Sequence, residues 1–215
     1  MIRTKHSAAS LAIVVFALTT NVDAQFFTHV KILAGTSAAN QSWQLSSNPE
    51  WQTDDRWSIA GSVSVEAVEL PFASLILGIQ YAQKGMAQRI PLTTESDPEN
   101  LSGRYFTISP RIDYLSFPLL VQVRVPLSTF TPYLLAGGRA DVMIAKRGNG
   151  YDAVIDKFRN SEIGLTGGIG AELPIHPLFD VIVEFRYDAS LQYSYSTEFL
   201  KVRNRAFVIL AGVRL

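Results

Sequence analysis

The chain has 215 residues with 19 basic and 19 acidic side chains, so its formal net charge is zero. That balance provides no basic surface for nucleic acid, which excludes this class of partner. Cysteine is absent, which excludes a thiol nucleophile and a Cys/His metal site.

The N-terminus has the three parts of a secretory signal peptide. Arg3 and Lys5 form a basic region, Ala8–Leu18 an apolar region, and Val22–Ala24 a cleavage site with small residues. The apolar run is too short to cross a bilayer as a helix. We therefore predict a signal peptide over residues 1–24, cleavage after Ala24, and one domain over residues 25–215.

No later apolar run is long enough for a membrane helix, so a membrane protein of this sequence must be a closed β-barrel. Eight segments alternate apolar and polar residues with the period of two that a strand requires. They are Phe27–Gly35, Trp57–Ala67, Leu75–Lys84, the two strands of Ile112–Ile144 on either side of the turn Val125–Thr131, Glu162–Leu173, Val181–Ala189 and Arg205–Leu215.

The connections between these segments alternate in length. Four are long: Thr36–Arg56, Gly85–Tyr105, Lys146–Asn160 and Ser190–Val202. Three are short: Glu69–Phe72, Val125–Thr131 and Pro174–Phe179. This order is typical of an even-stranded transmembrane barrel with long extracellular loops and short periplasmic turns. The predicted fold is all-β, an eight-stranded antiparallel up-and-down barrel in the outer membrane of a Gram-negative bacterium.

Aromatic residues lie where two interfacial girdles are expected. Those beside the turns are Phe72, Phe130, Tyr133 and Phe179, and those near the loops are Trp57, Tyr81, Tyr105 and Tyr187.

Two residues disturb the alternation of the strands. Asp113 has the parity of the lipid-facing residues, which requires a membrane segment that starts after it or a nearby bulge. Pro118 lacks a donor and predicts a local break in the ladder.

Several stretches resemble a known family. Tyr114–Arg124 and Thr131–Gly138 resemble the signature hairpin of the outer-membrane β-barrel domain family, the "porin family" proteins of Bacteroidetes type, and Tyr81–Gly85 and Gly167–Leu173 resemble further parts of it. The resemblance implies the barrel architecture and names no substrate. It also implies that outer-membrane assembly machinery recognises the C-terminal strand, although the last residue is Leu215 where these proteins carry an aromatic.

Charged residues fall on the face of each strand opposite the aliphatic residues, so we expect them inside the barrel. Six are basic and six acidic, which predicts ion pairs that fill the lumen of an eight-stranded barrel. The candidates are Lys31, Lys84, Arg124, Arg139, Arg186 and Arg214, with Glu66, Asp141, Glu162, Glu172, Glu184 and Asp188. By strand position, Lys31, Glu66, Arg124, Glu172 and Arg214 should lie toward the periplasmic end, and Lys84, Asp141, Glu162, Arg186 and Asp188 toward the outer end.

Little in the sequence indicates catalysis, a cofactor or a metal. The mature chain has His29, expected in the lumen near the periplasmic end, and His176, expected in a periplasmic turn. A histidine in a turn or in the lumen is far more often structural than catalytic, so the protein is predicted not to be an enzyme. Asp54–Asp55 and Ser96–Glu99 lack the spacing of a calcium loop. They are interpreted as solvated loops.

Three hypotheses for function follow. The first is a structural or interaction barrel, adhesion-like, whose extracellular loops meet a ligand while its wall contacts outer-membrane lipid. The second is a small-solute channel, as the porin name suggests, with a lipid-modifying barrel enzyme less favoured. The third is a soluble lipocalin-type barrel, which would have an apolar interior and would not explain the segregation of loop lengths.

Overall fold

The computed structural model describes residues 28–46, 48–51, 53–70, 72–93, 98–99 and 103–215. The predicted signal peptide lies outside this part of the chain. Within it, eight long strands run the length of a barrel: β1 (Val30–Leu45), β3 (Arg56–Glu69), β4 (Ala73–Gly85), β7 (Arg111–Arg124), β8 (Thr131–Arg147), β9 (Ser161–His176), β10 (Phe179–Ser190) and β12 (Leu200–Arg214). No helix in the described residues is long and apolar enough to cross a membrane.

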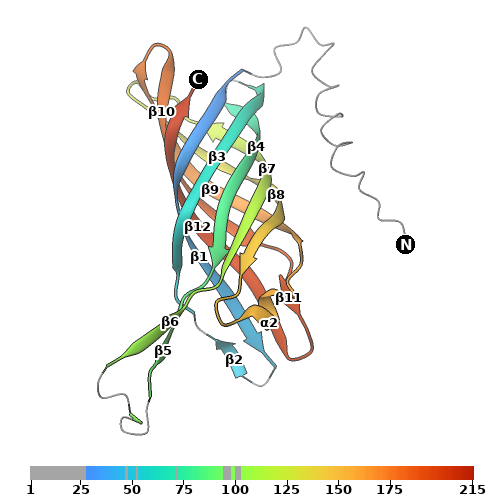
Figure 1. Cartoon of the computed structure of the whole chain (residues 1–215). Coiled ribbons are helices and arrows are strands. Elements are labelled where there is room, and N and C mark those ends of the chain that lie inside the picture. The colour runs from blue at the N-terminus through green and yellow to red at the C-terminus, as the bar shows by residue number, and fades with distance from the viewer. Residues whose placement is uncertain (1–27, 47, 52, 71, 94–97, 100–102) are drawn as a thin grey trace.

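Each long strand pairs antiparallel with its neighbours, in the order β12-β10-β9-β8-β7-β4-β3-β1. The pairing of β1 with β12 closes the sheet and runs from Lys31 opposite Arg214 to Leu45 opposite Leu200. The predicted eight-stranded antiparallel barrel is therefore confirmed (Figure 1). Closure leaves neither β1 nor β12 as a free edge.

The two faces of the wall differ as the alternation predicted. Outward side chains are aliphatic or aromatic and exposed, for example Ile59, Ile79, Leu134 and Phe207. Most inward side chains are polar or charged and buried, in contrast to the apolar interior expected of a lipocalin-type barrel. The soluble ligand-binding barrel is thereby excluded on geometry.

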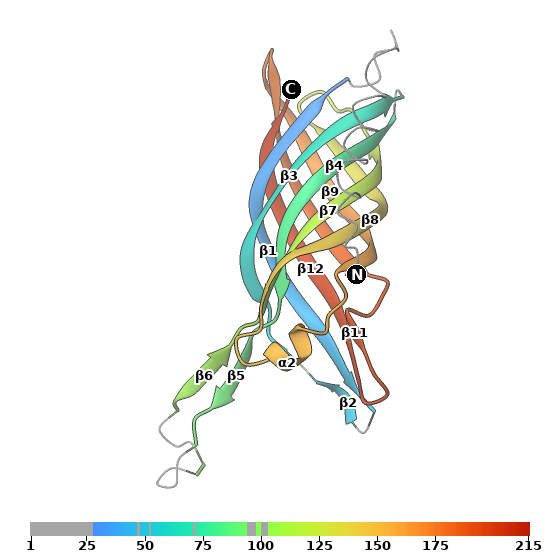
Figure 2. The same ribbon diagram turned by 45° about the vertical axis from the view of Figure 1, so that its right-hand side comes forward.

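The short and long connections lie at opposite ends of the barrel. The three short turns, the start of β1 and the C-terminus share one end, which we call the turn end (Figure 1). The four longer connections share the other, the loop end. They carry β2 (Asn48–Trp51), the pair β5 (Gln88–Pro91) and β6 (Tyr105–Ile108), α2 (Asp152–Ile155) and β11 (Tyr195–Ser196). Figure 2 shows the β5–β6 hairpin projecting away from the barrel.

The first strand is longer than predicted. It continues from Gly35 to Leu45, so most of the connection predicted over Thr36–Arg56 is strand. The alternation is hidden here because Ala38 and Ala39 are both buried, and because Asn40 donates to the Thr53 carbonyl and to Asp55 from the following loop. The last strand likewise begins at Leu200 rather than Arg205.

The two irregular residues have separate explanations. The β7–β8 register shifts between Asp113 and Tyr114, whose partners are Ala145 and Met143, so β8 has a bulge at Ile144. Asp113 itself stays on the outer side, where Arg111 donates to it through Nε at 2.7 Å and Nη2 at 2.6 Å. Pro118 is paired with Arg139 of β8. On its other side, the pairing of β7 with β4 is interrupted at Pro118, between the pair Leu77–Leu119 and the pair Gln80–Ser116.

Two of the aromatic residues are not in the girdles to which the sequence assigned them. Tyr133 is only 3% exposed and points into the barrel, as expected from its parity beside Leu134. Tyr105 begins β6, in the hairpin beyond the barrel wall. Phe72, Phe130, Trp57 and Tyr187 are exposed at the ends of their strands, where an interfacial girdle is expected.

Candidate functional site

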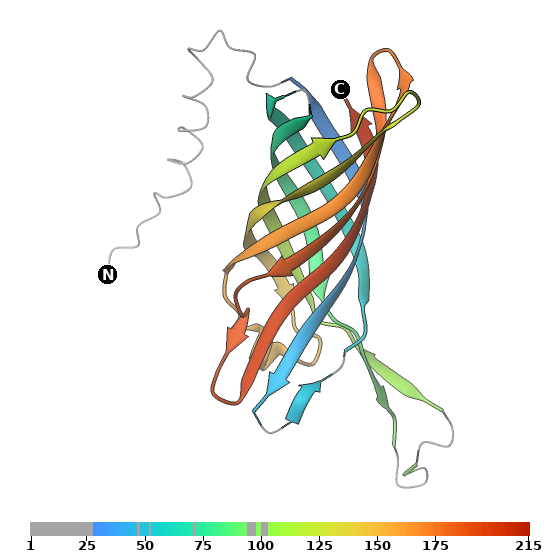
Figure 3. The same cartoon turned by 180° about the vertical axis from the view of Figure 1, so that it is seen from behind.

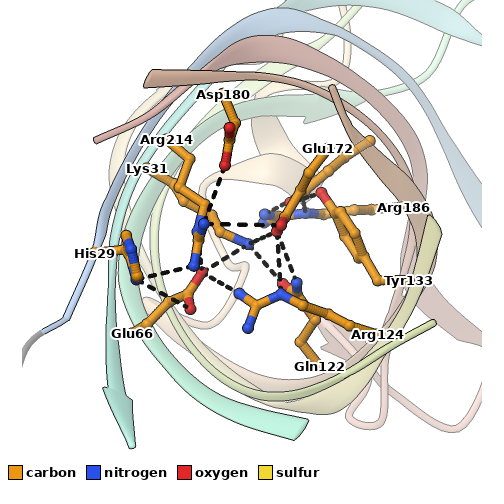
Figure 4. A network of polar contacts seen from close by, with 11 residues as sticks. His29, Lys31, Glu66, Gln122, Arg124, Tyr133, Glu172, Asp180, Arg186 and Arg214 are labelled. Atoms are coloured by element: carbon orange, nitrogen blue, oxygen red, sulfur yellow. Dashed lines mark hydrogen bonds and ion pairs between the residues drawn. The ribbon is translucent and has the colours of Figure 1, made fainter. Parts of the chain in front are cut away.

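The interior of the barrel holds almost all of the polar chemistry, and it is organised in layers. At the turn end, the side chains of Lys31, Arg124 and Arg214 meet those of Glu66 and Glu172 (Figure 4). We call these five residues, together with His29, Gln122 and Asp180, the turn-end cluster. They come from β1, β3, β7, β9, β10 and β12 and the residues just before β1, so the cluster ties most of the wall together.

Glu66 is the centre of this cluster. Its Oε1 lies 3.3 Å from Lys31 Nζ, 2.5 Å from Arg124 Nη2 and 3.1 Å from Arg214 Nε. Its other oxygen, Oε2, lies 3.9 Å from His29 Nδ1. A carboxylate buried this completely is tolerable only with such partners, because the desolvation of an unpaired charge would destabilise the fold.

Glu172 balances the remaining positive charge. Its Oε1 accepts from Gln122 Nε2 at 3.0 Å and from Arg124 Nε at 3.3 Å, and it lies 3.4 Å from Lys31 Nζ. Lys31 also donates to Gln122 Oε1 at 2.6 Å. Asp180 pairs with Arg214 Nη1 at 3.1 Å. The cluster thus has three basic and three acidic side chains, with His29 beside them.

A layer of aliphatic side chains also crosses the barrel interior. Each of six strands contributes one inward residue with an exposed fraction of 3% or less: Leu33, Ile76, Leu120, Leu135, Ile182 and Leu210. We call this set the interior apolar layer. It lies directly next to the turn-end cluster along the strands, for example Leu33 after Lys31 and Leu120 before Gln122. An apolar layer of this kind opposes the passage of water and dissolved ions at this level of the lumen.

Further from the turn end, a second group of charges is paired. Arg186 donates through Nε to Glu184 Oε2 at 2.6 Å, and Glu184 Oε1 accepts from the Tyr133 hydroxyl at 2.7 Å. Arg186 Nη1 also donates to Gln80 Oε1 at 2.9 Å. Gln80 in turn donates to Asp188 Oδ2 at 3.2 Å. This hydrogen-bonded chain crosses the lumen.

A third group lies nearest the loop end. Lys84 Nζ is 2.6 Å from Asp141 Oδ2, and Arg139 Nη1 is 2.8 Å from the same oxygen. Glu162 is held by neutral donors: Tyr114 Oη at 2.8 Å, Ser190 Oγ at 2.7 Å and Asn204 Nδ2 at 3.0 Å. Arg139 Nη1 also lies 3.6 Å from Asp188 Oδ2, which links this group to the one below it.

The loop end is covered by an apolar cap. Ile155 and Phe158, in and after α2, are 1% and 4% exposed and pack with Trp43, Met86 and Val202 from the ends of the barrel strands. The Tyr151 ring packs against Trp43 in a tilted arrangement, 5.3 Å between ring centroids, and its hydroxyl donates to Gln88. Burial raises the pKa of Tyr151, so this hydroxyl stays protonated and remains a donor.

All twelve residues proposed from the sequence as interior charges point into the barrel. Eleven are buried, with exposed fractions of 8% or less, and Arg214 is half-buried at the mouth of the turn end. The five residues expected at the periplasmic end lie in the turn-end cluster, and Lys84, Asp141 and Glu162 lie in the group nearest the loop end. Arg186 and Asp188 were expected at the outer end, but they belong to the middle group with Glu184. His29 lies in the turn-end cluster, and His176 lies exposed at the end of β9 with its ring stacked on Phe179.

Sequence reasoning missed the neutral members of the network. Gln80, Gln122 and Asn204 are buried and bridge charged groups, as the Tyr114 and Tyr133 hydroxyls also do. Their alternation placed them on the inward face, but the candidates were chosen by charge, and these residues are neutral. The cap was also missed, because Trp43, Met86, Ile155 and Phe158 lie in segments that the sequence predicts to be long extracellular loops.

Within the described ranges, no group of three or more His, Asp and Glu side chains is placed to hold a metal ion. Asp55 accepts from Asn40, and Asp54 forms an isolated bridge with Ala87. Ser96 and Asp97 lie outside the described residues, so the interpretation of that loop stays a prediction.

The chain was compared with known proteins. Residues 24–196 match a family described as "Outer membrane protein beta-barrel domain". The chain belongs to this family. A search of curated protein sequences found no match.

Several solved structures are similar to this member of the outer-membrane barrel family. The attachment invasion locus protein Ail of Yersinia pestis is 14% identical, with 87% of this chain and 98% of that chain covered and a TM-score of 0.42. Neisserial surface protein A is 12% identical, with 87% and 98% covered and a TM-score of 0.47. OprG from Pseudomonas aeruginosa is 13% identical, with 90% and 98% covered and a TM-score of 0.45. Similarity at this level does not extend to what these proteins bind.

Proposed function

We propose that this protein is an interaction barrel of a Gram-negative outer membrane, which binds a partner outside the cell through its loop end and neither conducts solutes nor catalyses a reaction. One observation carries the proposal. The lumen is occupied by paired charges, by the interior apolar layer and by the apolar cap, so the loops are the main surface left for an activity.

The β5–β6 hairpin is the element best placed to meet a partner. It projects beyond the barrel (Figure 2), and its two strands pair with each other from Gln88 opposite Ile108 to Pro91 opposite Tyr105. Tyr105 is 59% exposed and Phe106 53% exposed. Aromatic side chains on a projecting element are typical of binding surfaces, because each buries a large area when a partner covers it.

The orientation follows from the segregation of the connections. In barrels of this kind the short turns face the periplasm and the long loops face outward. We accordingly place the turn end in the periplasm and the loop end outside the cell. The C-terminal strand β12, which ends at the turn end, is the proposed contact for the outer-membrane assembly machinery.

A small-solute channel remains the alternative, and one observation favours it. The buried hydroxyls of Ser62, Ser64 and Ser74 point inward from β3 and β4 and have no hydrogen-bond partner within the described residues. Small polar groups of this kind leave room for water along one side of the lumen. The interior apolar layer opposes a continuous water path, so the interaction role is the better supported.

The proposal is tested with bacteria that display the full chain on their surface. A Gram-negative host that lacks the protein would express the wild type, a Tyr105→Ser/Phe106→Ser variant, or Phe199→Ser as a matched control. Phe199 is 75% exposed but lies in the connection between β10 and β12. The readout is the number of bacteria retained on epithelial monolayers and on surfaces coated with matrix proteins.

We expect the wild type to raise retention several-fold over the empty vector, the hairpin variant to lose most of that gain, and the control to keep it. Folding of each variant is checked by heat-modifiable mobility on gels. If bacteria with the folded wild type were retained no better than those with the empty vector, an interaction role would be contradicted. An equal loss of retention in the Phe199→Ser control would show that the hairpin is not the specific binding element.

A further inference from the structure

Three basic residues occupy successive outward positions near the start of β12. Lys201, Arg203 and Arg205 are all exposed, while the residues between them, Val202 and Asn204, are fully buried. The three side chains therefore point away from the barrel. At this level β12 lies beside β1 (Figure 3). We call these residues the basic row.

The basic row differs from the basic residues inside the barrel. No described carboxylate lies within 4.0 Å of any of the three, whereas Lys31, Lys84 and Arg139 are all paired. Two residues of the row contact one aromatic ring: the centroid of Tyr193 lies 5.6 Å from Lys201 Nζ and 4.6 Å from Arg203 Cζ. A ring of this kind orients the two cations without neutralising them.

The height of the row relative to the membrane follows from the rest of the strand. Below Arg205, the outward residues are Phe207, Ile209, Ala211 and Val213, with Phe207 packed at 4.8 Å between ring centroids on Tyr187. A strand tilted by about 40° rises about 25 Å over ten residues. That is about the height of the apolar band of such barrels. Arg205 therefore lies at the edge of the hydrocarbon, and Arg203 and Lys201 lie within and above the headgroup layer.

Exposed basic residues are also distributed unequally between the two ends of the barrel. The described Lys and Arg residues with exposed side chains all lie at the loop end: Arg89, Arg104, Lys146, Arg147, Lys157, Arg159, Lys201, Arg203 and Arg205. At the turn end, Lys31 and Arg124 are buried and Arg214 is half-buried in the turn-end cluster. Attraction to anionic headgroups is thus available in the leaflet on the loop side.

We propose that the basic row binds the phosphate groups of anionic lipids in the leaflet that surrounds the loop end. The partner is a lipid because the row continues the membrane-facing side of β12 and lies next to its apolar residues. The phosphate is favoured because a guanidinium donates two parallel hydrogen bonds to it, and because a basic side chain near the surface attracts anionic lipid. This inference concerns the wall of the barrel and is independent of the proposed role of the hairpin.

The test is lipid binding by the purified full chain in mixed micelles, with phosphatidic acid and phosphatidylcholine at equal concentration as the probes. Native mass spectrometry counts the molecules of each lipid that remain bound. We expect a preference for phosphatidic acid of about 100-fold in the wild type, since each of the three basic groups contributes about fivefold and these factors multiply. A Lys201→Gln/Arg203→Gln/Arg205→Gln variant should retain less than about a third of that preference.

The control variant is Arg89→Gln/Arg147→Gln/Lys157→Gln, which removes the same charge from exposed positions of the loops. This variant should keep the wild-type preference for phosphatidic acid. The wild type should also keep it when inorganic phosphate is added in excess, because the free ion has no acyl chains to hold it beside the barrel. An equal loss in the control, or an unchanged preference in the basic-row variant, would overturn the proposal. If the triple variant does not fold, Lys201→Gln and Arg205→Gln alone must each lower the preference by at least about twofold, or the proposal fails.

Discussion

Lys84 and Asp141 form an ion pair inside the barrel, with Nζ 2.6 Å from Oδ2 and both side chains completely buried. The two residues belong to β4 and β8, which are separated in the sheet by β7, so the contact bridges over β7 rather than joining a neighbouring pair of strands. Lys84 Nζ also lies 4.7 Å from the centroid of the Tyr114 ring. Asp141 has a second cation, Arg139, at 2.8 Å.

The two partners should therefore respond unequally to mutation. Asp141→Asn leaves both Lys84 and Arg139 with weakened pairing, and we expect it to lower the free energy of unfolding by about 3–5 kcal/mol. Lys84→Met leaves Asp141 paired with Arg139, so we expect a loss of about 1–2 kcal/mol. Urea unfolding in detergent micelles, followed by tryptophan fluorescence, measures both. Ser62→Ala serves as the control, because this buried hydroxyl has no partner to lose. Equal losses for Asp141→Asn and Ser62→Ala would contradict the network.

The interior apolar layer is tested by two adjacent residues of β7. Leu120 is 1% exposed and faces inward, while Leu119 is 50% exposed on the membrane side. We expect Leu120→Ala to lower the free energy of unfolding by about 2–5 kcal/mol, because it leaves a cavity in a packed layer. Leu119→Ala should cost about 1 kcal/mol or less, since lipid fills the space. The same unfolding measurement compares them, and a larger loss for Leu119→Ala would show that the inward and outward faces are assigned the wrong way round.

Two glycines of β9 give a second test of the inward face. A Cβ added at Gly170 would lie 2.4 Å from Tyr133 Cζ, whereas one added at Gly167 meets no atom within 4 Å. Gly170→Ala should displace the Tyr133 ring, break its hydrogen bond to Glu184 and destabilise the barrel by about 1–3 kcal/mol. Gly167→Ala should be close to neutral. Thermal unfolding monitored by circular dichroism distinguishes the pair, and similar midpoints for both variants would contradict the packing of Tyr133.

The cap can be loosened without unfolding the barrel. Phe158 is 4% exposed and stacks at 6.2 Å between ring centroids on Tyr195. Phe158→Ala should open the segment around α2, because it removes the largest buried side chain of that segment, while the barrel strands stay paired. We expect amide hydrogen exchange over residues 151–159 to accelerate at least tenfold, with β7 and β8 unchanged. Phe199→Ala, at an exposed position, is the control. Unchanged exchange in Phe158→Ala would mean that the cap does not depend on this ring.

The sequence predicted the barrel well because alternation is a local signal. Ile59, Val63 and Val65 alternate with Ser58, Ser62 and Ser64 within one strand, and the parity alone assigns each face. The same parity located the interior charges, since a charge on the lipid side would be destabilising. Lengths of connections then fixed the order of turns and loops.

What could not be predicted depends on contacts between distant segments. Ala38 and Asn40 face outward but are buried, and Asn40 is hydrogen-bonded to the following loop. They therefore interrupt the alternation by which a membrane strand is predicted. Ile155 and Phe158 are apolar residues in a segment that lies between charged ones, and only the barrel mouth gives them a place to be buried. Tyr133 was assigned to the girdle from its nearness to a turn, although its parity placed it inside. Gly170, which makes room for that ring, is on the neighbouring strand.

We propose that the barrel is closed to solutes along its lumen, and single-channel recording in planar bilayers measures whether it is. The purified full chain should give no stable conductance steps of porin size, because the interior apolar layer and the paired charges leave no continuous aqueous path. A Phe158→Ala variant should also remain silent, since the interior apolar layer persists when the cap opens. Reproducible, long-lived steps from the folded wild type would contradict the closed lumen and favour the small-solute channel.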